Sequence, residues 1–147
     1  MRLEIELVPS PLWEKSLRKT LQRAEWERLR AHRIQEKGKR CEICGREGSV
    51  QLHEIWGYDD ESHVQRLAGF QLLCGECHSI KHFGRTQTLA SEGKLDLKPV
   101  VSHFCKVNDC TPRDFEKHWK AAYEVWKKRS QHEWRQDVNL LKQLGLL

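Results

Sequence analysis

The sequence predicts an α+β fold: a small finger of two strands and a helix, held by four cysteines and embedded in N-terminal and C-terminal helices. Three observations predict it. Two Cys-x2-Cys pairs occur at 41–44 and 74–77. Polar and apolar residues alternate just after the first pair, and apolar residues recur at helical spacing on either side of the finger. We therefore divide the chain into a basic N-terminal region, 1–40, the finger, 41–85, and a helical region, 86–147, that packs on the same domain.

Length and composition favour one small domain with a modest core. The chain has 147 residues, of which 38% are apolar and 32% are charged, so a structural metal ion would add appreciably to its stability. There is no apolar run of membrane-spanning length and no signal-peptide pattern. Since paired cysteines without a secretory signal indicate reduced thiols, we expect a cytoplasmic location.

The N-terminal region is predicted to begin with a short strand or an extended arm and to continue as helix. In residues 1–8, aliphatic side chains alternate with glutamates, which is typical of a half-buried extended segment. Ser10 precedes a proline and is suited to begin a helix. The apolar stripe that starts with Trp13 and Leu17 is predicted to face the core, and Gly38 is predicted to end the helical region.

The positive charge of the chain is concentrated before the first cysteine pair. Residues 1–40 hold 11 Lys or Arg and 6 Asp or Glu, whereas the rest of the chain holds 15 of each. Lys and Arg attract phosphate largely without regard to sequence. We therefore expect a nucleic acid partner, DNA in the first place, bound through Arg23, Arg30, Arg33 and their neighbours. The alternative is that these residues form a solvated helix face.

The two cysteine pairs predict a structural zinc site. A pair of cysteines two residues apart can turn around one ion, and two such pairs complete a tetrahedral set of sulfurs. The expected ligands are Cys41, Cys44, Cys74 and Cys77. Free thiols or disulfides are the alternative. A second site is conceivable but irregularly spaced, and buried thiols are the favoured interpretation of its residues, His103, Cys105, Cys110 and His118.

Between and after the cysteine pairs, the finger carries four histidines, of which His53, His78 and His82 are the candidate metal ligands. Alternation around His53 predicts a strand, residues 57–60 a turn, and the apolar segment that follows a return strand. His78 and His82 lie one turn apart on the predicted finger helix, which Gly84 is predicted to end. Two imidazoles so placed can hold one divalent cation and leave positions open for water and a phosphate oxygen.

The C-terminal region is predicted to be helical. Residues 86–96 are polar and favour a loop, and 97–107 favour a helix. Thr111, followed by a proline, is suited to begin another helix, whose apolar stripe is aromatic. The stripe comprises Phe115, Trp119, Tyr123 and Trp126. A last short helix is expected near the C-terminus.

Residues Cys41 to Arg85 resemble the HNH endonucleases, the ββα-metal or His-Me finger family, in the subgroup whose finger is braced by a four-cysteine zinc site. The resemblance is carried by Cys41, Cys44, His53-Glu54-Ile55, Leu73-Cys74-x2-Cys77-His78 and His82. The segments HEIW-x-YDD, VQRLAG and LLC-x2-CH-x2-KHFG are also similar to HNH proteins of bacteria and phages without an assigned substrate. We therefore expect a bacterial or phage source.

The resemblance implies a metal-dependent endonuclease that hydrolyses phosphodiester bonds, most readily in DNA. It implies a structural zinc ion at the four cysteines and one catalytic divalent ion, Mg, Mn, Ni or Zn, held by His53, His78 and His82. Lys81 and Arg85 would bind the phosphate or stabilise the transition state, with ordinary surface charge as the alternative.

The chain departs from the HNH pattern at two positions. Glu54 stands where most members have the histidine that activates water, and it is therefore the expected general base; in the alternative register, His53 is the base. Gly69 stands at the position of the middle asparagine. These departures also allow a catalytically decayed, zinc-stabilised module that binds DNA or protein. Three convergent imidazoles favour the nuclease, since a pure binder has no need of them. The form of the substrate, the native metal and the oligomeric state stay open.

Overall fold

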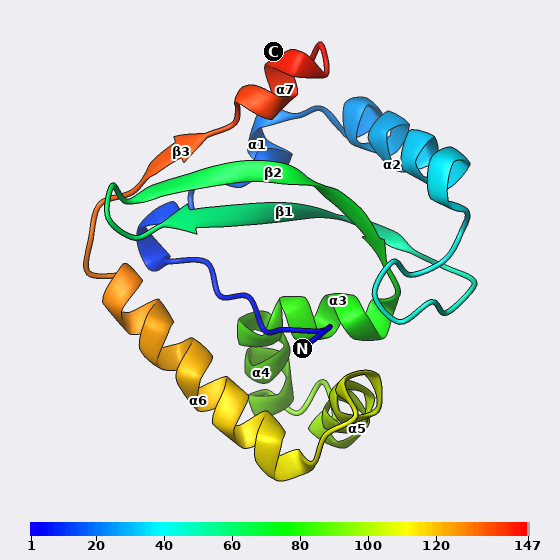
Figure 1. Ribbon diagram of the computed structural model, residues 1–147, viewed down its shortest axis with the longest axis vertical. Helices are drawn as coiled ribbons and strands as arrows, with labels where there is room; N and C mark the ends of the chain where they lie inside the picture. Colours follow the sequence, from blue (N-terminus) through cyan, green and yellow to red (C-terminus); the bar gives the residue numbers. More distant parts are fainter. Residues whose placement is uncertain (147) are drawn as a thin grey trace.

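The computed structural model describes residues 1–146 and shows an α+β protein built on a long antiparallel hairpin (Figure 1). Strand β1, Gln51–Asp59, pairs with β2, Val64–Leu73. A short third strand, β3, Arg135–Asp137, pairs parallel to the beginning of β2, so the sheet order is β1-β2-β3. The predicted α+β class and both strands of the finger are confirmed.

Helices cover both sides of the hairpin (Figure 1). A 3-10 turn, Ser10–Leu12, precedes them. On one side lie α1, Leu17–Thr20, α2, Arg23–Lys37, and α7, Asn139–Gln143. On the other side lie α3, Gly75–Lys81, α4, Phe83–Ser91, α5, Leu97–Asn108, and α6, Pro112–Arg129.

The register of the hairpin decides which side chains face which helices. Directly opposed residues of an antiparallel pair lie on the same face of the sheet. Leu52 opposes Leu72 and Glu54 opposes Phe70. Leu52 and Phe70 pack against α2, so Glu54 shares the α2 face. His53 lies between them in the strand and therefore points to the opposite face, toward α3.

The larger hydrophobic core lies on the α3 side and includes the N-terminal residues. Leu3 and Ile5 are buried together with Ile80, Phe104 and Phe115. The segment that carries Leu3 and Ile5 belongs to no strand; it is the extended arm predicted as one of two alternatives, and it runs between β1 and the helices α3 and α6 (Figure 1). The amide of Ile5 donates a hydrogen bond to the α6 side chain His118 at 2.8 Å, which fixes the arm against the core.

Helix α4 was not predicted. Gly84 was expected to end the finger helix, whereas α3 ends at Lys81, His82 separates the two helices, and α4 includes Gly84. A Cβ atom at Gly84 would lie 3.5 Å from Cδ2 of Leu7, an ordinary van der Waals distance, so the N-terminal arm passes close to α4 at this residue. Strand β3 was also missed, and Trp13, predicted to face the core, is 61% exposed.

Candidate functional site

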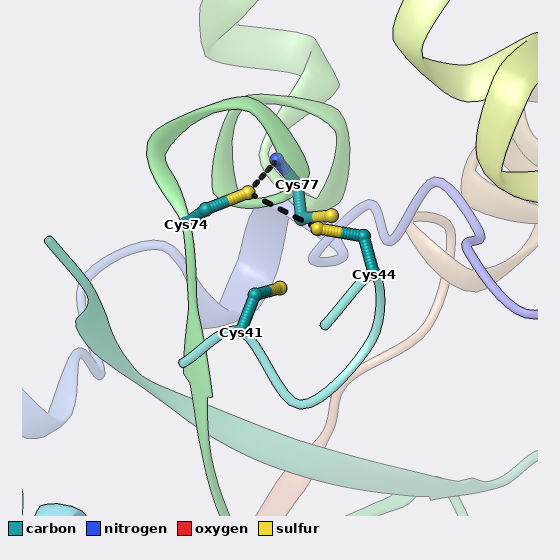
Figure 2. Close-up of side chains that lie close together, drawn as sticks. All are labelled: Cys41, Cys44, Cys74 and Cys77. Carbon is teal, nitrogen blue, oxygen red and sulfur yellow. Dashed lines mark hydrogen bonds between the residues drawn. The ribbon is translucent and has the colours of Figure 1, made fainter. Parts of the chain in front are cut away.

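Four cysteines, two before β1 and two after β2, point their sulfurs toward one another at the open end of the hairpin (Figure 2). Cys41 and Cys44 lie on the loop before β1, Cys74 follows β2, and Cys77 lies in the first turn of α3. All four sulfurs lie within 4.8 Å of one another, and those of Cys44 and Cys74 are 3.7 Å apart. Zinc–sulfur bonds of about 2.3 Å give a tetrahedron with edges of about 3.8 Å. The cluster therefore fits a structural zinc ion.

Local backbone geometry prepares the sulfurs for a metal. Gly45 has a φ of 79°, which the tight turn after Cys44 requires, and its amide donates to the Cys41 carbonyl at 2.9 Å. The amide of Cys77 donates to the sulfur of Cys74 at 3.4 Å. A hydrogen bond with the Cys77 thiol lowers the pKa of Cys41, which favours the thiolate, the form that binds metals.

His103 belongs to this cluster rather than to a second zinc site. Its Nε2 lies 3.2 Å from the sulfur of Cys77, and its Nδ1 lies 3.1 Å from the carboxylate of Glu76. His118, another candidate for a second site, accepts the amide of Ile5. Within residues 1–146, the ligand-type side chains of the proposed second site form no group around a common point.

The three predicted imidazoles converge on the α3 side of the hairpin. The ring centroids of His53 and His78 lie 5.5 Å apart, those of His53 and His82 4.9 Å, and those of His78 and His82 4.5 Å. One nitrogen of each ring lies within 4.8 Å of one nitrogen of both others. His53 is only 2% exposed, while the other two are half-buried. The geometry suits a single metal ion.

Glu6 on the N-terminal arm adds a carboxylate that the sequence analysis missed. Its Oε2 lies 3.5 Å from Nε2 of His53, and its amide donates to the carbonyl of Lys81 at 3.2 Å. Oε1 of Glu6 and Nδ1 of His53 are buried, and neither has a hydrogen-bond partner in the described chain. Buried polar atoms without a partner call for an ion, a water molecule or a ligand, so these residues fit a metal centre.

Glu54, the expected general base, does not join this group. It lies on the α2 face of the hairpin, opposite Phe70, whose ring packs edge-on against Trp26 of α2. The imidazole of His53 faces α3. Neighbouring residues of a strand point to opposite faces, and the structure therefore separates the two residues that the sequence analysis assigned to one reaction centre.

Lys81 and Arg85 flank the imidazoles as expected. Arg85 and His82 line one hollow of about 460 Å³, and Lys81 lines another of about 400 Å³. Glu6 lines both and thus lies between them. Of the three imidazoles, that of His82 lines a hollow, and a ligand can approach it from the surface beside Arg85.

The basic helix α2 lies on the other face of the sheet from the imidazoles, and two of its three expected DNA contacts bond to the protein itself. Nε of Arg30 donates to the carbonyl of Val50 at 3.1 Å. Arg33 donates two hydrogen bonds to Glu42, at 3.1 and 2.7 Å. Arg23 is exposed. Arg30 and Arg33 thus tie α2 to the finger, and of the three only Arg23 has the exposure of a phosphate contact.

The Arg33–Glu42 pair gives a testable stability prediction. Burial raises the pKa of Glu42, but hydrogen bonds from Arg33 and from the Leu72 amide outweigh it and lower that pKa overall. The stabilisation is therefore complete above the pKa of an unfolded glutamate and is lost as the pH falls below it. Arg33→Ala should lower the free energy of unfolding by about 1–3 kcal/mol at pH 7, measured by urea denaturation. Arg23→Ala, the exposed control, should change it by less than about 0.5 kcal/mol; equal effects of the two substitutions would contradict the structural role.

Comparisons of this chain with protein-family models, with curated proteins and with solved structures found no match. In residues 1–146, every helix is too short or too polar to cross a lipid bilayer.

Proposed function

We propose that this protein is a metal-dependent nuclease of the HNH type that hydrolyses phosphodiester bonds in DNA. The observation that carries the proposal is the convergence of His53, His78 and His82 with the Glu6 carboxylate beside two open hollows. The four-cysteine cluster braces the start of α3, the helix that presents two of the three imidazoles. In this proposal the four-cysteine cluster has a structural role, and the three imidazoles have a catalytic one.

The three imidazoles are the proposed ligands of one divalent ion. Such an ion, when bound, would supply positive charge to the scissile phosphate and to the leaving oxygen. His53 is almost fully buried on β1. His78 lies within α3, and His82 caps the C-terminal end of that helix. Two secondary-structure elements packed on one core therefore fix the ligand geometry before a substrate arrives, which limits the reorganisation needed in the reaction.

Glu6 is the proposed proton acceptor for the attacking water, in place of Glu54. A general base must lie within hydrogen-bonding reach of the proton that it removes. Glu6 lies beside His53 with one oxygen unpaired, whereas Glu54 lies on the other face of the sheet. Lys81 and Arg85 would contact phosphate oxygens from the two flanks and stabilise the charge that develops there.

A plasmid-nicking assay tests the proposal. Wild-type protein is expected to convert supercoiled plasmid to the open circle with at least one of Mg, Mn, Ni and Zn. His82→Ala removes a proposed ligand and should lower the rate by at least about tenfold, because even partners of metal ligands commonly matter by 10–100-fold. His32→Ala is the matched control, since His32 is an exposed α2 histidine paired with Glu36, and its rate should stay within twofold.

The assay also separates the two functions that the sequence leaves open. Protein that binds DNA but cleaves neither the plasmid nor a single-stranded oligonucleotide with any of the four ions would be a zinc-stabilised binding module. Nicking that survives His82→Ala unchanged at every metal concentration would show that the activity comes from elsewhere, and would overturn this assignment of the site.

A further inference from the structure

An aromatic cavity of about 460 Å³ adjoins His82, one of the three imidazoles. Its lining includes His82 and Arg85 from the candidate site. Four large aromatic side chains make up another part of the wall, and we use the name aromatic cavity for the hollow that they line: Trp13, Trp119, Tyr123 and Trp126. Cavities of about 300–1,000 Å³ are of the size that holds small ligands, so this volume can hold groups larger than a phosphate.

Three of these rings form a stack. Trp13 lies against Trp126 with centroids 6.2 Å apart and planes 18° apart, and Tyr123 lies against Trp126 at 5.6 Å and 23°. Trp119, Tyr123 and Trp126 occur at i, i+4 and i+7 of α6, which places them along one face of the helix. Trp13 comes from the N-terminal region. The stack therefore joins segments distant in the sequence into one surface.

The rings at the two ends of the stack are exposed although the stack is held in place. Trp13 is 61% exposed and Tyr123 is 43% exposed. The indole N–H groups of Trp13 and Trp126 both donate to the carbonyl of Val8, at 2.8 and 3.0 Å. A ring already fixed in its bound orientation loses little conformational entropy when a partner stacks on it. This arrangement suits a ligand with flat faces better than an aliphatic one.

Positive charge accompanies the rings. Arg85 lines the cavity next to His82, and Nζ of Lys127 lies 5.4 Å from the centroid of the Tyr123 ring. Proteins that bind single strands combine aromatic rings, on which bases stack, with cations that follow the backbone phosphates. The rings, Arg85 and the proposed metal ligand His82 line one hollow, so a strand with its phosphate at His82 would bring adjacent bases to the stack.

We propose that the aromatic cavity binds unpaired nucleotides next to the scissile phosphate. The substrate is then a single strand, or a duplex interrupted by unpaired nucleotides, because bases within a duplex are stacked on one another and do not offer their faces to protein rings. This inference rests on the proposed nuclease function and adds to it the form of the substrate. Trp13, as the most exposed ring of the stack, is the residue expected to contact the base.

Binding of a fluorescein-labelled oligothymidylate of about 15 nucleotides, followed by anisotropy without added divalent ion, tests the inference. Trp13→Ala should weaken binding about 5- to 150-fold, the usual effect of losing one stacked base. Trp13→Phe keeps a stacking ring and should restore most of the affinity. Leu144→Ala removes an exposed apolar side chain outside the cavity and should change affinity by less than twofold. Tyr123→Ala gives an independent measurement if Trp13→Ala does not fold, as judged by circular dichroism.

A fully paired duplex of similar length provides the second arm. Trp13→Ala should alter its affinity by less than twofold. If folded Trp13→Ala and Tyr123→Ala bind oligothymidylate as wild type does, or if the duplex loses as much affinity, the inference is overturned. The nicking assay tests the nuclease function separately. If Trp13→Ala loses oligothymidylate binding but the wild-type protein never nicks, only the nuclease proposal is contradicted. If nicking depends on His82 but Trp13→Ala has no effect on binding, only the proposed role of the aromatic cavity is contradicted.

Discussion

Cys74→Ser is expected to give protein that does not fold cooperatively. Cys74 lies between β2 and α3 and caps the start of α3. Cys41, Cys74 and Cys77 are buried in the larger hydrophobic core. A structural zinc ion contributes on the order of 10–16 kcal/mol in small domains, whereas the net stability of a domain is only about 5–15 kcal/mol. Loss of one ligand therefore removes a contribution as large as the whole margin of stability.

The measurements are metal content by mass spectrometry and thermal unfolding by circular dichroism. Wild type should hold about one zinc equivalent and lose its cooperative transition on prolonged treatment with a chelator. Cys110→Ser is the matched control, because Cys110 is half-buried and lies outside the cluster; it should keep both the zinc and the transition. Folded wild type with less than about half an equivalent of zinc, or Cys74→Ser with an unchanged transition, would refute the structural assignment.

Local patterns predicted the parts of the site that depend on short-range geometry. The spacing of the cysteine pairs follows from the turn that each makes around a metal, and His78 and His82 follow from the pitch of a helix. The alternation around His53 predicted β1, in which half-buried and exposed residues alternate from Glu54 to Asp59. These features could be inferred because each is encoded within a few consecutive residues.

The missed features depend on contacts between distant segments. Glu6 reaches His53 from 47 positions earlier in the chain, and no periodicity in residues 1–8 marks that contact. Helix α4 includes Gly84, which lies close to Leu7 of the N-terminal arm. The position of Glu54, in contrast, could be inferred from the sequence. Neighbouring residues of a strand point to opposite faces, so alternation already put Glu54 on the other face of the strand from His53. Glu54 was nevertheless predicted to be the general base, because the family resemblance aligns it with the residue that usually has this role.

Glu6→Gln is expected to depress hydrolysis by about 10²–10⁴-fold at saturating metal, the usual contribution of a general base. The substitution keeps the shape of the side chain and removes its ability to accept a proton. The backbone hydrogen bond from Glu6 to Lys81 does not depend on the side chain, so the arm should stay in place. Glu54→Gln makes the same chemical change on the α2 face and should leave the rate within a few-fold of wild type. The two substitutions make the same chemical change on opposite sides of the hairpin.

A titration of the nicking rate with metal distinguishes proton transfer from metal binding at Glu6. If the carboxylate accepts the proton, the defect of Glu6→Gln persists at every metal concentration, whereas that of His53→Ala should be partly recovered as metal is raised, because occupancy rather than chemistry is lost. If Glu6 were instead a fourth ligand, raising metal would rescue both variants. If His53 were the base, His53→Ala would stay inactive at any metal concentration and Glu6→Gln would keep substantial activity. A Glu54→Gln variant that is folded yet about 100-fold slower, beside an active Glu6→Gln, would restore Glu54 as the base, and would require the hairpin to present its α2 face to the substrate.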